Sequence, residues 1–203
     1  MAIGGAERQE SYEVQIKIRL DDPDETARRV ESDPLRIIRH VHYLEYDTYF
    51  TFDDPEQGRL RYREDDFIDE KGDVFNVRYR LTLIGLAAER EFPNSVLLSR
   101  SRFIAPASHS LRFYTEYFKP AATMEIHKDR RRWLVSFDGV EFFINIDRLL
   151  DPRVDDCYME VKSRTWSRHD AEEKAQRISE LLKILGLETA DRVSDEYPAL
   201  IPE

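Results

Sequence analysis

The sequence has almost none of the residues that build disulfide frameworks, thiolate metal clusters or membrane spans. Cys157 is the only cysteine among 203 residues, so neither an intrachain disulfide nor a cysteine-based zinc cluster is available. No apolar run reaches the roughly 18 residues that a membrane-spanning helix requires, and residues 1–10 lack the apolar segment of a signal peptide. These absences favour a reducing, cytoplasmic setting without a membrane partner.

Positive charge is also in deficit over the chain as a whole. There are 41 Asp and Glu against 31 Lys and Arg, which gives a formal net charge of −10. A strongly acidic chain is a poor partner for duplex nucleic acid, which selects extended basic surfaces. Charged residues nevertheless make up 35% of the sequence and hydrophobic residues 41%, so one sizeable domain with a real core is expected.

Most of the chain alternates between apolar and polar residues, a pattern typical of β-strands. The predicted strands are Tyr12–Leu20, Leu44–Phe52, Gly58–Ile68, Val74–Ile84, Glu89–Phe92, Thr123–Lys128, Arg130–Asp138, Val140–Asp147 and Cys157–Arg164. The predicted helices are Pro23–Val30, Asn94–Arg102, Pro106–Phe118 and the amphipathic segment Asp170–Leu187. Because most connections are short, the strands, about eight in all, should pair antiparallel.

The polar faces of these strands carry ionisable side chains at two-residue spacing. They are Glu13, Lys17, Arg59, Arg61, Arg63, Arg78, Arg80, Lys128, Arg130, Arg132, Asp147, Glu160, Lys162 and Arg164. If the sheet curls, these faces converge on a lumen, and a lumen lined by cations requires a bound anion. The planar guanidinium group suits phosphate oxygens in particular. Alternation alone equally allows salt-bridged ladders that face solvent.

Several short segments then match a known pattern in order and spacing. They are EVQIK at 13–17, DTYFTF at 47–52, LRYRE at 60–64, YRLTLIG at 79–85, ERE at 89–91, KDRRRW at 128–133, INID at 144–147 and YMEVK at 158–162. Together they resemble the CYTH superfamily, also called triphosphate tunnel metalloenzymes. The resemblance covers residues 12–197, which leaves 1–11 as a flexible leader and 198–203 as a tail.

The resemblance implies an α+β fold, a closed or nearly closed antiparallel eight-stranded β-barrel with peripheral helices. It also implies a hydrolase that cleaves inorganic tripolyphosphate or an organic triphosphate inside the barrel with Mg²⁺ or Mn²⁺. Two other functions stay open: an adenylate cyclase, and a non-catalytic module that binds polyphosphate or a nucleotide. A homodimer is compatible with the sequence.

The resemblance also assigns roles to residues. The catalytic set is Glu13, Lys17 and Glu160. The phosphate-binding set is Lys17, Arg61, Arg63, Arg78, Arg80, Lys128, Arg130, Arg132 and Lys162. The metal-binding set is Glu13, Glu160, Asp147, Glu89 and Glu91.

Two positions depart from the family pattern, because Gln15 and Lys162 each stand where a carboxylate is usual. An amide binds hard cations weakly and an ammonium does not bind them, so metal binding should be weakened or reduced to one ion. Arg59 and Arg164, near strand ends, are expected in solvent, and Arg131 is expected to face outward.

Overall fold

The computed structural model describes residues 12–54, 58–84, 88–92, 96–100, 103–108 and 110–201, with side chains given for these ranges except for Tyr12 and for residues 84–105. The strands are β1 Tyr12–Leu20, β2 Arg36–Thr51, β3 Arg59–Ile68, β4 Val74–Ile84, β5 Ala88–Phe92, β6 Val96–Arg100, β7 Phe103–Pro106, β8 Ala122–Phe137, β9 Val140–Asp151 and β10 Arg153–Thr165. The helices are α1 Pro23–Val30, α2 Leu111–Phe118 and α3 Arg168–Ile184, followed by a 3₁₀ turn at Tyr197–Leu200.

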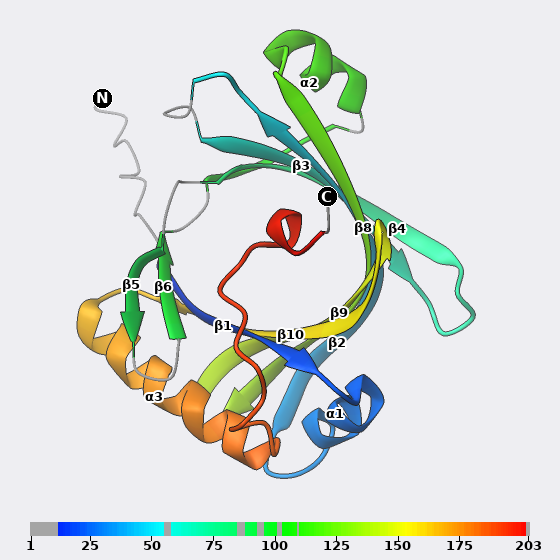
Figure 1. Cartoon of the computed structure of the whole chain (residues 1–203). Helices are drawn as coiled ribbons and strands as arrows, with labels where there is room; N and C mark the ends of the chain where they lie inside the picture. The colour runs from blue at the N-terminus through cyan, green and yellow to red at the C-terminus, as the bar shows by residue number, and fades with distance from the viewer. Residues whose placement is uncertain are drawn as a thin grey trace, which may run out of the picture.

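One antiparallel sheet contains all ten of these strands, in the order β5-β6-β1-β10-β9-β8-β2-β3-β4-β7. Figure 1 shows the sheet curled into a ring around a central space. Within the described residues the edge strands β5 and β7 do not pair, so the ring is nearly closed. The predicted α+β fold with a nearly closed antiparallel barrel is therefore confirmed, with ten strands in place of about eight.

Of the two additional strands, β6 comes from a segment that was predicted as a helix, and β7 lies between two predicted helices except for its last residue, Pro106. The prediction of a helix at Asn94–Arg102 is wrong, because Val96–Arg100 forms β6 and pairs with both β1 and β5. A short apolar run of this kind can form either a helix or a strand, and here pairing with the free edge of β1 favours the strand. The helix expected from Pro106 begins only at Leu111, and Phe103–Pro106 forms β7 on the edge of β4.

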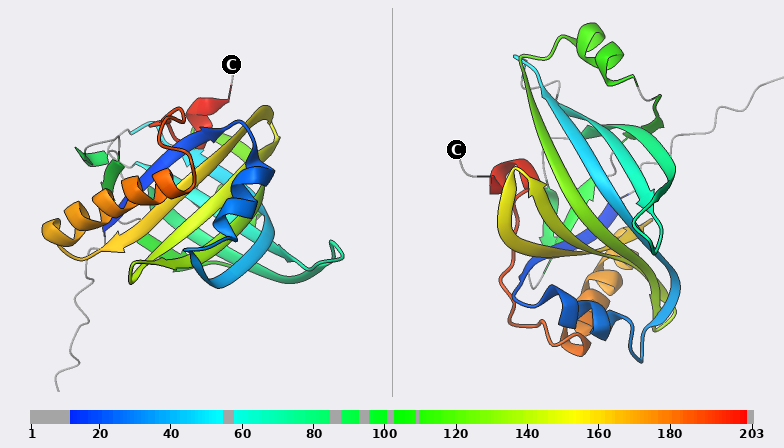
Figure 2. Two further views of the ribbon diagram at one scale, coloured as in Figure 1. Left: turned by 90° about the horizontal axis from the view of Figure 1, so that it is seen from below. Right: turned by 90° about the vertical axis from the view of Figure 1, so that its right-hand side faces the viewer.

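The larger hydrophobic cluster lies outside the ring, between the outer face of the sheet and helices α1 and α3. A smaller cluster, which contains Tyr49 and Tyr197 of the cavity wall, lies on the inner face. Figure 2 shows α1 and α3 against the outer face. The α3 residues Ala171, Ile178 and Leu182 are buried in one cluster with Val14 and Met159 of the sheet. Since the outer face takes up the apolar side chains, strand alternation turns the polar ones inward.

A tight turn between β8 and β9 fixes the register of the central strands. Asp138 and Gly139 have φ of 47° and 76°, the two left-handed residues that a type I′ hairpin requires. The resulting register places Arg130 opposite Asp147. The turn therefore determines which charged side chains meet inside the ring.

The segment after α3 returns to β1 and then enters the ring. The backbone N–H of Arg19 donates to Asp191 (3.0 Å), and that of Val193 donates to Lys17 (2.9 Å). The Tyr197–Leu200 turn then lies within the ring in Figure 1. In the part of the chain that the structure describes, no helix is long and apolar enough to cross a membrane.

Candidate functional site

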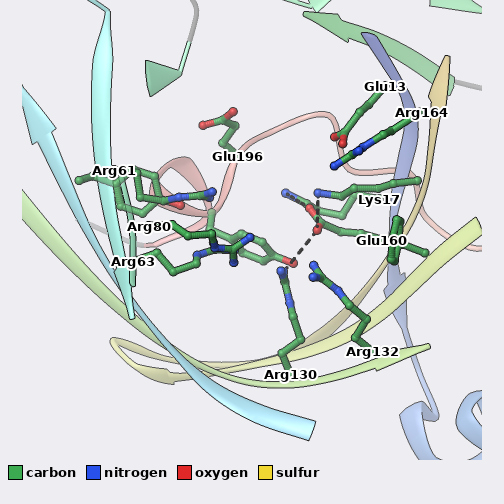
Figure 3. A pocket seen from close by; sticks show the side chains of 14 residues that line it. Glu13, Lys17, Arg61, Arg63, Arg80, Arg130, Arg132, Glu160, Arg164 and Glu196 are labelled. Atoms are coloured by element: carbon green, nitrogen blue, oxygen red, sulfur yellow. Dashed lines mark hydrogen bonds and ion pairs between the residues drawn. The ribbon is translucent and has the colours of Figure 1, made fainter. Parts of the chain in front are cut away.

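A cavity of about 180 Å³ opens on the inner face of the sheet. Figure 3 shows side chains that converge on it from several strands and from the C-terminal segment. Its lining consists of Glu13, Lys17, Tyr49, Arg61, Arg63, Arg80, Arg130, Arg132, Phe143, Glu160, Lys162, Arg164, Glu196 and Tyr197. Eight of these side chains are Lys or Arg and three are Glu, which is a formal charge of +5. A chain that carries −10 overall thus concentrates positive charge at one place.

The structure brings most of the predicted site residues together and leaves others behind the wall. Those that line the cavity are Glu13, Lys17, Arg61, Arg63, Arg80, Arg130, Arg132, Glu160 and Lys162. Arg78, Lys128 and Asp147 do not line it. Glu89 and Glu91 lie on β5, and their side chains are outside the described part of the chain.

Beneath the cavity lies a buried layer of ion pairs. Glu45 and Asp47 of β2 are each almost completely buried. Lys128 Nζ lies 2.5 Å from Glu45 and 2.9 Å from Asp47, and Arg63 lies 2.6 Å from Glu45 and 2.5 Å from Asp47. Burial alone would raise the pKa of both carboxyl groups, but the surrounding cations hold the pKa of each below its usual range. Neither acid was singled out from the sequence.

Arg130 joins this layer to the cavity. Its guanidinium group binds both oxygens of Asp147 at 2.5 Å and reaches Glu45 at 3.0 Å and Glu160 at 3.3 Å. The Tyr197 hydroxyl also donates to Asp147. Both carboxylate oxygens of Asp147 are therefore occupied by protein donors, so a metal ion would have to displace them.

Two arginines present buried donors that make no hydrogen bond within the protein, although Arg61 Nε lies 3.5 Å from a carboxylate oxygen of Asp47. The Nε groups of Arg61 and Arg80 are buried and make no hydrogen bond. Burial lowers the pKa of Arg80 to about 10, with Arg63 as a further cause that outweighs the attraction of Asp65. Buried donors are normally satisfied, so unpaired ones on a cavity wall indicate the place of an anionic ligand.

Glu160 lies among cations on the opposite wall. Lys162 Nζ is 2.9 Å from its carboxylate, Arg130 is 3.3 Å away and Lys17 is 3.8 Å away. Burial would raise the pKa of Glu160, but Lys162, Lys17 and Arg130 hold it well below the usual value. Burial also lowers the pKa of Lys17, against the opposing effect of Glu160. An added anion would relieve the excess of positive charge here.

Stability should fall on acidification because buried carboxylates are held ionised. A lowered folded pKa contributes stability above the unfolded value of about 4 and loses it as pH falls through the folded value. We expect the urea midpoint to stay level from about pH 7 to about pH 5 and to drop below about pH 4. Urea unfolding across this range tests this, and a midpoint that rises on acidification would contradict it. Glu45, Asp47 and Glu160 are the groups responsible.

The donor set limits what metal the cavity can hold. Among the described residues, no group of three His, Cys, Asp or Glu side chains is placed to bind an ion. Glu13 and Glu160 do line the same cavity. Two carboxylates suit one hard ion that takes its remaining ligands from water and substrate phosphates, as Mg²⁺ commonly does. Glu13 lies opposite Arg164 and Glu160 lies opposite Lys17, four residues further along β1, so the two carboxylates would hold one divalent ion only together with a bound phosphate chain.

The sequence analysis missed part of the wall. Arg164 is exposed, as expected, but it also lines the cavity. Glu196 and Tyr197 also line it, and Arg59 pairs with Glu196 at 2.8 Å. Strand alternation gave no signal for Glu196 and Tyr197, because these two residues lie in an irregular segment. Arg131 faces outward as expected, since it pairs with Asp24 of α1.

Comparison with known proteins agrees with this geometry. Residues 11–197 match the family described as the CYTH domain. The chain belongs to the CYTH family. Among solved structures, the CYTH chain is similar to the PH1819 protein from Pyrococcus horikoshii, with a TM-score of 0.66 and 17% identity over 90% of this chain and 94% of that one.

Two further structures carry descriptions of activity. A putative adenylate cyclase from Vibrio parahaemolyticus has a TM-score of 0.58 and 16% identity, covering 93% of this CYTH chain and 97% of that chain. A putative adenylyl cyclase from Hippeastrum, described as having a dominant triphosphatase activity, has a TM-score of 0.52 and 12% identity, covering 93% and 94%. Similarity at this level shows the fold alone. The search of curated proteins gave no match.

Proposed function

We propose that this CYTH protein hydrolyses a triphosphate, either inorganic tripolyphosphate or an organic triphosphate, inside the cationic cavity. The observation that carries the proposal is the wall itself, with a formal charge of +5 and buried Nε donors on Arg61 and Arg80 that make no hydrogen bond within the protein. Guanidinium groups on several strands suit a chain of phosphates better than a single carboxylate, because each phosphate offers a separate set of oxygens.

The proposed roles follow from position. Arg61 and Arg80 on one wall and Arg132 on another hold the phosphate chain, and Lys17 contacts one end of it. Glu13 and Glu160 would hold one Mg²⁺ or Mn²⁺ ion. When bound, such an ion neutralises phosphate charge and makes a coordinated water more acidic. No Ser, Cys or His belongs to the lining among the described residues, which supports direct transfer to water.

A second candidate, a non-catalytic polyphosphate-binding module, is favoured by one specific pair. Gln15 and Lys162 face each other across β1 and β10, so neither strand offers a carboxylate there. This arrangement keeps the phosphate-binding wall while removing metal ligands. Binding and turnover must therefore be measured separately.

The test is release of phosphate from tripolyphosphate, thiamine triphosphate and ATP, each with Mg²⁺, with Mn²⁺ and with a chelator. We expect release that depends on the divalent ion and is lost in the Arg61→Ala variant. If no substrate is cleaved while tripolyphosphate still raises the melting temperature, the hydrolase is ruled out and the binding module stands.

A further inference from the structure

Lys162 occupies a bridging position between protein carboxylate and cavity. Its ammonium group lies 2.9 Å from Glu160, and both side chains line the cavity. In sites that hold a phosphate chain through a metal, the ion contacts a protein carboxylate on one side and phosphate oxygens on the other. Lys162 already has the carboxylate contact and is placed for the phosphate contact.

The residue directly opposite Lys162 on the neighbouring strand adds no second anion, although Glu13 lines the same cavity two residues further along β1. The cross-strand partner of Lys162 on β1 is Gln15, which is neutral, and the next pair along is Lys17 with Glu160. Arg130 and Lys17 also form ion pairs with the Glu160 carboxylate, at 3.3 Å and 3.8 Å. The Glu160 carboxylate is therefore already neutralised by Lys162, Arg130 and Lys17 before any ion arrives.

We propose that Lys162 bridges Glu160 and the phosphate chain when no divalent ion is bound, so that the triphosphate binds tightly without metal. The inference rests on the proposed function and separates binding of the triphosphate from its hydrolysis. Binding requires only the cationic wall, and a divalent ion is needed only for hydrolysis. The chemical class of the ligand that binds is then the metal-free polyphosphate anion.

Isothermal titration calorimetry with inorganic tripolyphosphate tests this. The wild-type protein should bind in chelator within about threefold of its affinity in Mg²⁺, a difference below 1 kcal/mol. In Lys162→Glu, affinity in chelator should fall by about 100-fold, and Mg²⁺ should restore most of it because the variant offers another carboxylate. Lys162→Gln should lose about tenfold in chelator and regain little with Mg²⁺.

The matched control is Lys183→Glu, which makes the same charge change at an exposed position on α3. It should bind as the wild type does, and melting curves of all variants establish that they are folded. Wild-type binding that requires Mg²⁺, or unchanged binding by Lys162→Glu in chelator, would overturn the inference and leave the proposed function intact. Absence of tripolyphosphate binding in every condition would overturn the proposed function as well.

Discussion

Replacing Lys128 with methionine is expected to lower the free energy of unfolding by about 3–5 kcal/mol. Lys128 is completely buried and is shared by Glu45 and Asp47 at 2.5 and 2.9 Å. Methionine fills a similar volume but carries no charge, so the two buried carboxylates lose one of the cations that neutralise them. Burial of unbalanced charge is among the largest single costs in a folded protein. Urea or thermal unfolding measures the loss.

The control for Lys128→Met is Arg153→Met, which removes a pair between exposed side chains, Arg153 and Asp155 at 3.5 Å. Exposed pairs contribute about 0–1 kcal/mol, so this variant should unfold almost as the wild type does. Equal losses in the two variants would show that the buried layer does not stabilise the fold in the way described.

Arg80→Ala should weaken tripolyphosphate binding by about 10- to 100-fold, the effect of losing one or two charge-assisted hydrogen bonds. Arg80 lines the cavity, and its buried Nε makes no hydrogen bond within the protein. Its pKa, lowered to about 10 by burial and by Arg63, keeps the group charged at neutral pH. Calorimetry or a shift in melting temperature reports the loss.

Arg78→Ala is a closely matched control for Arg80→Ala. Arg78 and Arg80 lie on the same face of β4, and each contacts the same oxygen of Asp65 at 2.8 Å. Either variant leaves Asp65 one cationic partner, so the effects on the layer should be similar. Only Arg80 lines the cavity. Comparable losses of binding in both variants would contradict the assignment of Arg80 to the phosphate wall.

Strand alternation predicted the fold well because one property, the burial of every second residue, governs most of the chain. The bounds Tyr12–Leu20 for β1 and Pro23–Val30 for α1 agree with the structure. The confusions of helix with strand fall between residues 94 and 110, where short apolar stretches suit either state. Pairing with distant β1 and β4 decides their state, and such partners are not encoded locally. Elsewhere β2 begins at Arg36 and not at Leu44, and the two strands predicted between residues 123 and 138 form the single strand β8.

The site was predictable to the extent that it depends on strand faces. The two-residue alternation of a β-strand places Arg61 and Arg63 on the same side of β3. The curl of the sheet brings that side to the cavity. The two-residue alternation does not distinguish a side chain that lines the cavity from one that lies in the buried layer beneath it. Lys128 is two residues from Arg130 on β8, yet only Arg130 reaches the cavity. Depth depends on the buried partners Glu45 and Asp47, which only the three-dimensional arrangement shows.

The position of β1 within the sheet has a consequence for how the chain folds. β1 pairs with β10, so Tyr12 meets Thr165, and the other edge of β1 takes β6 and the segment near Val193. The first strand of the described sheet in sequence order is thus among the last to find its main partner. Contacts of such long sequence separation slow folding, because loop-closure entropy is lost before they form. During synthesis, the half of the cavity that contains Glu13 and Lys17 cannot assemble until β10 and the segment near Val193 have left the ribosome.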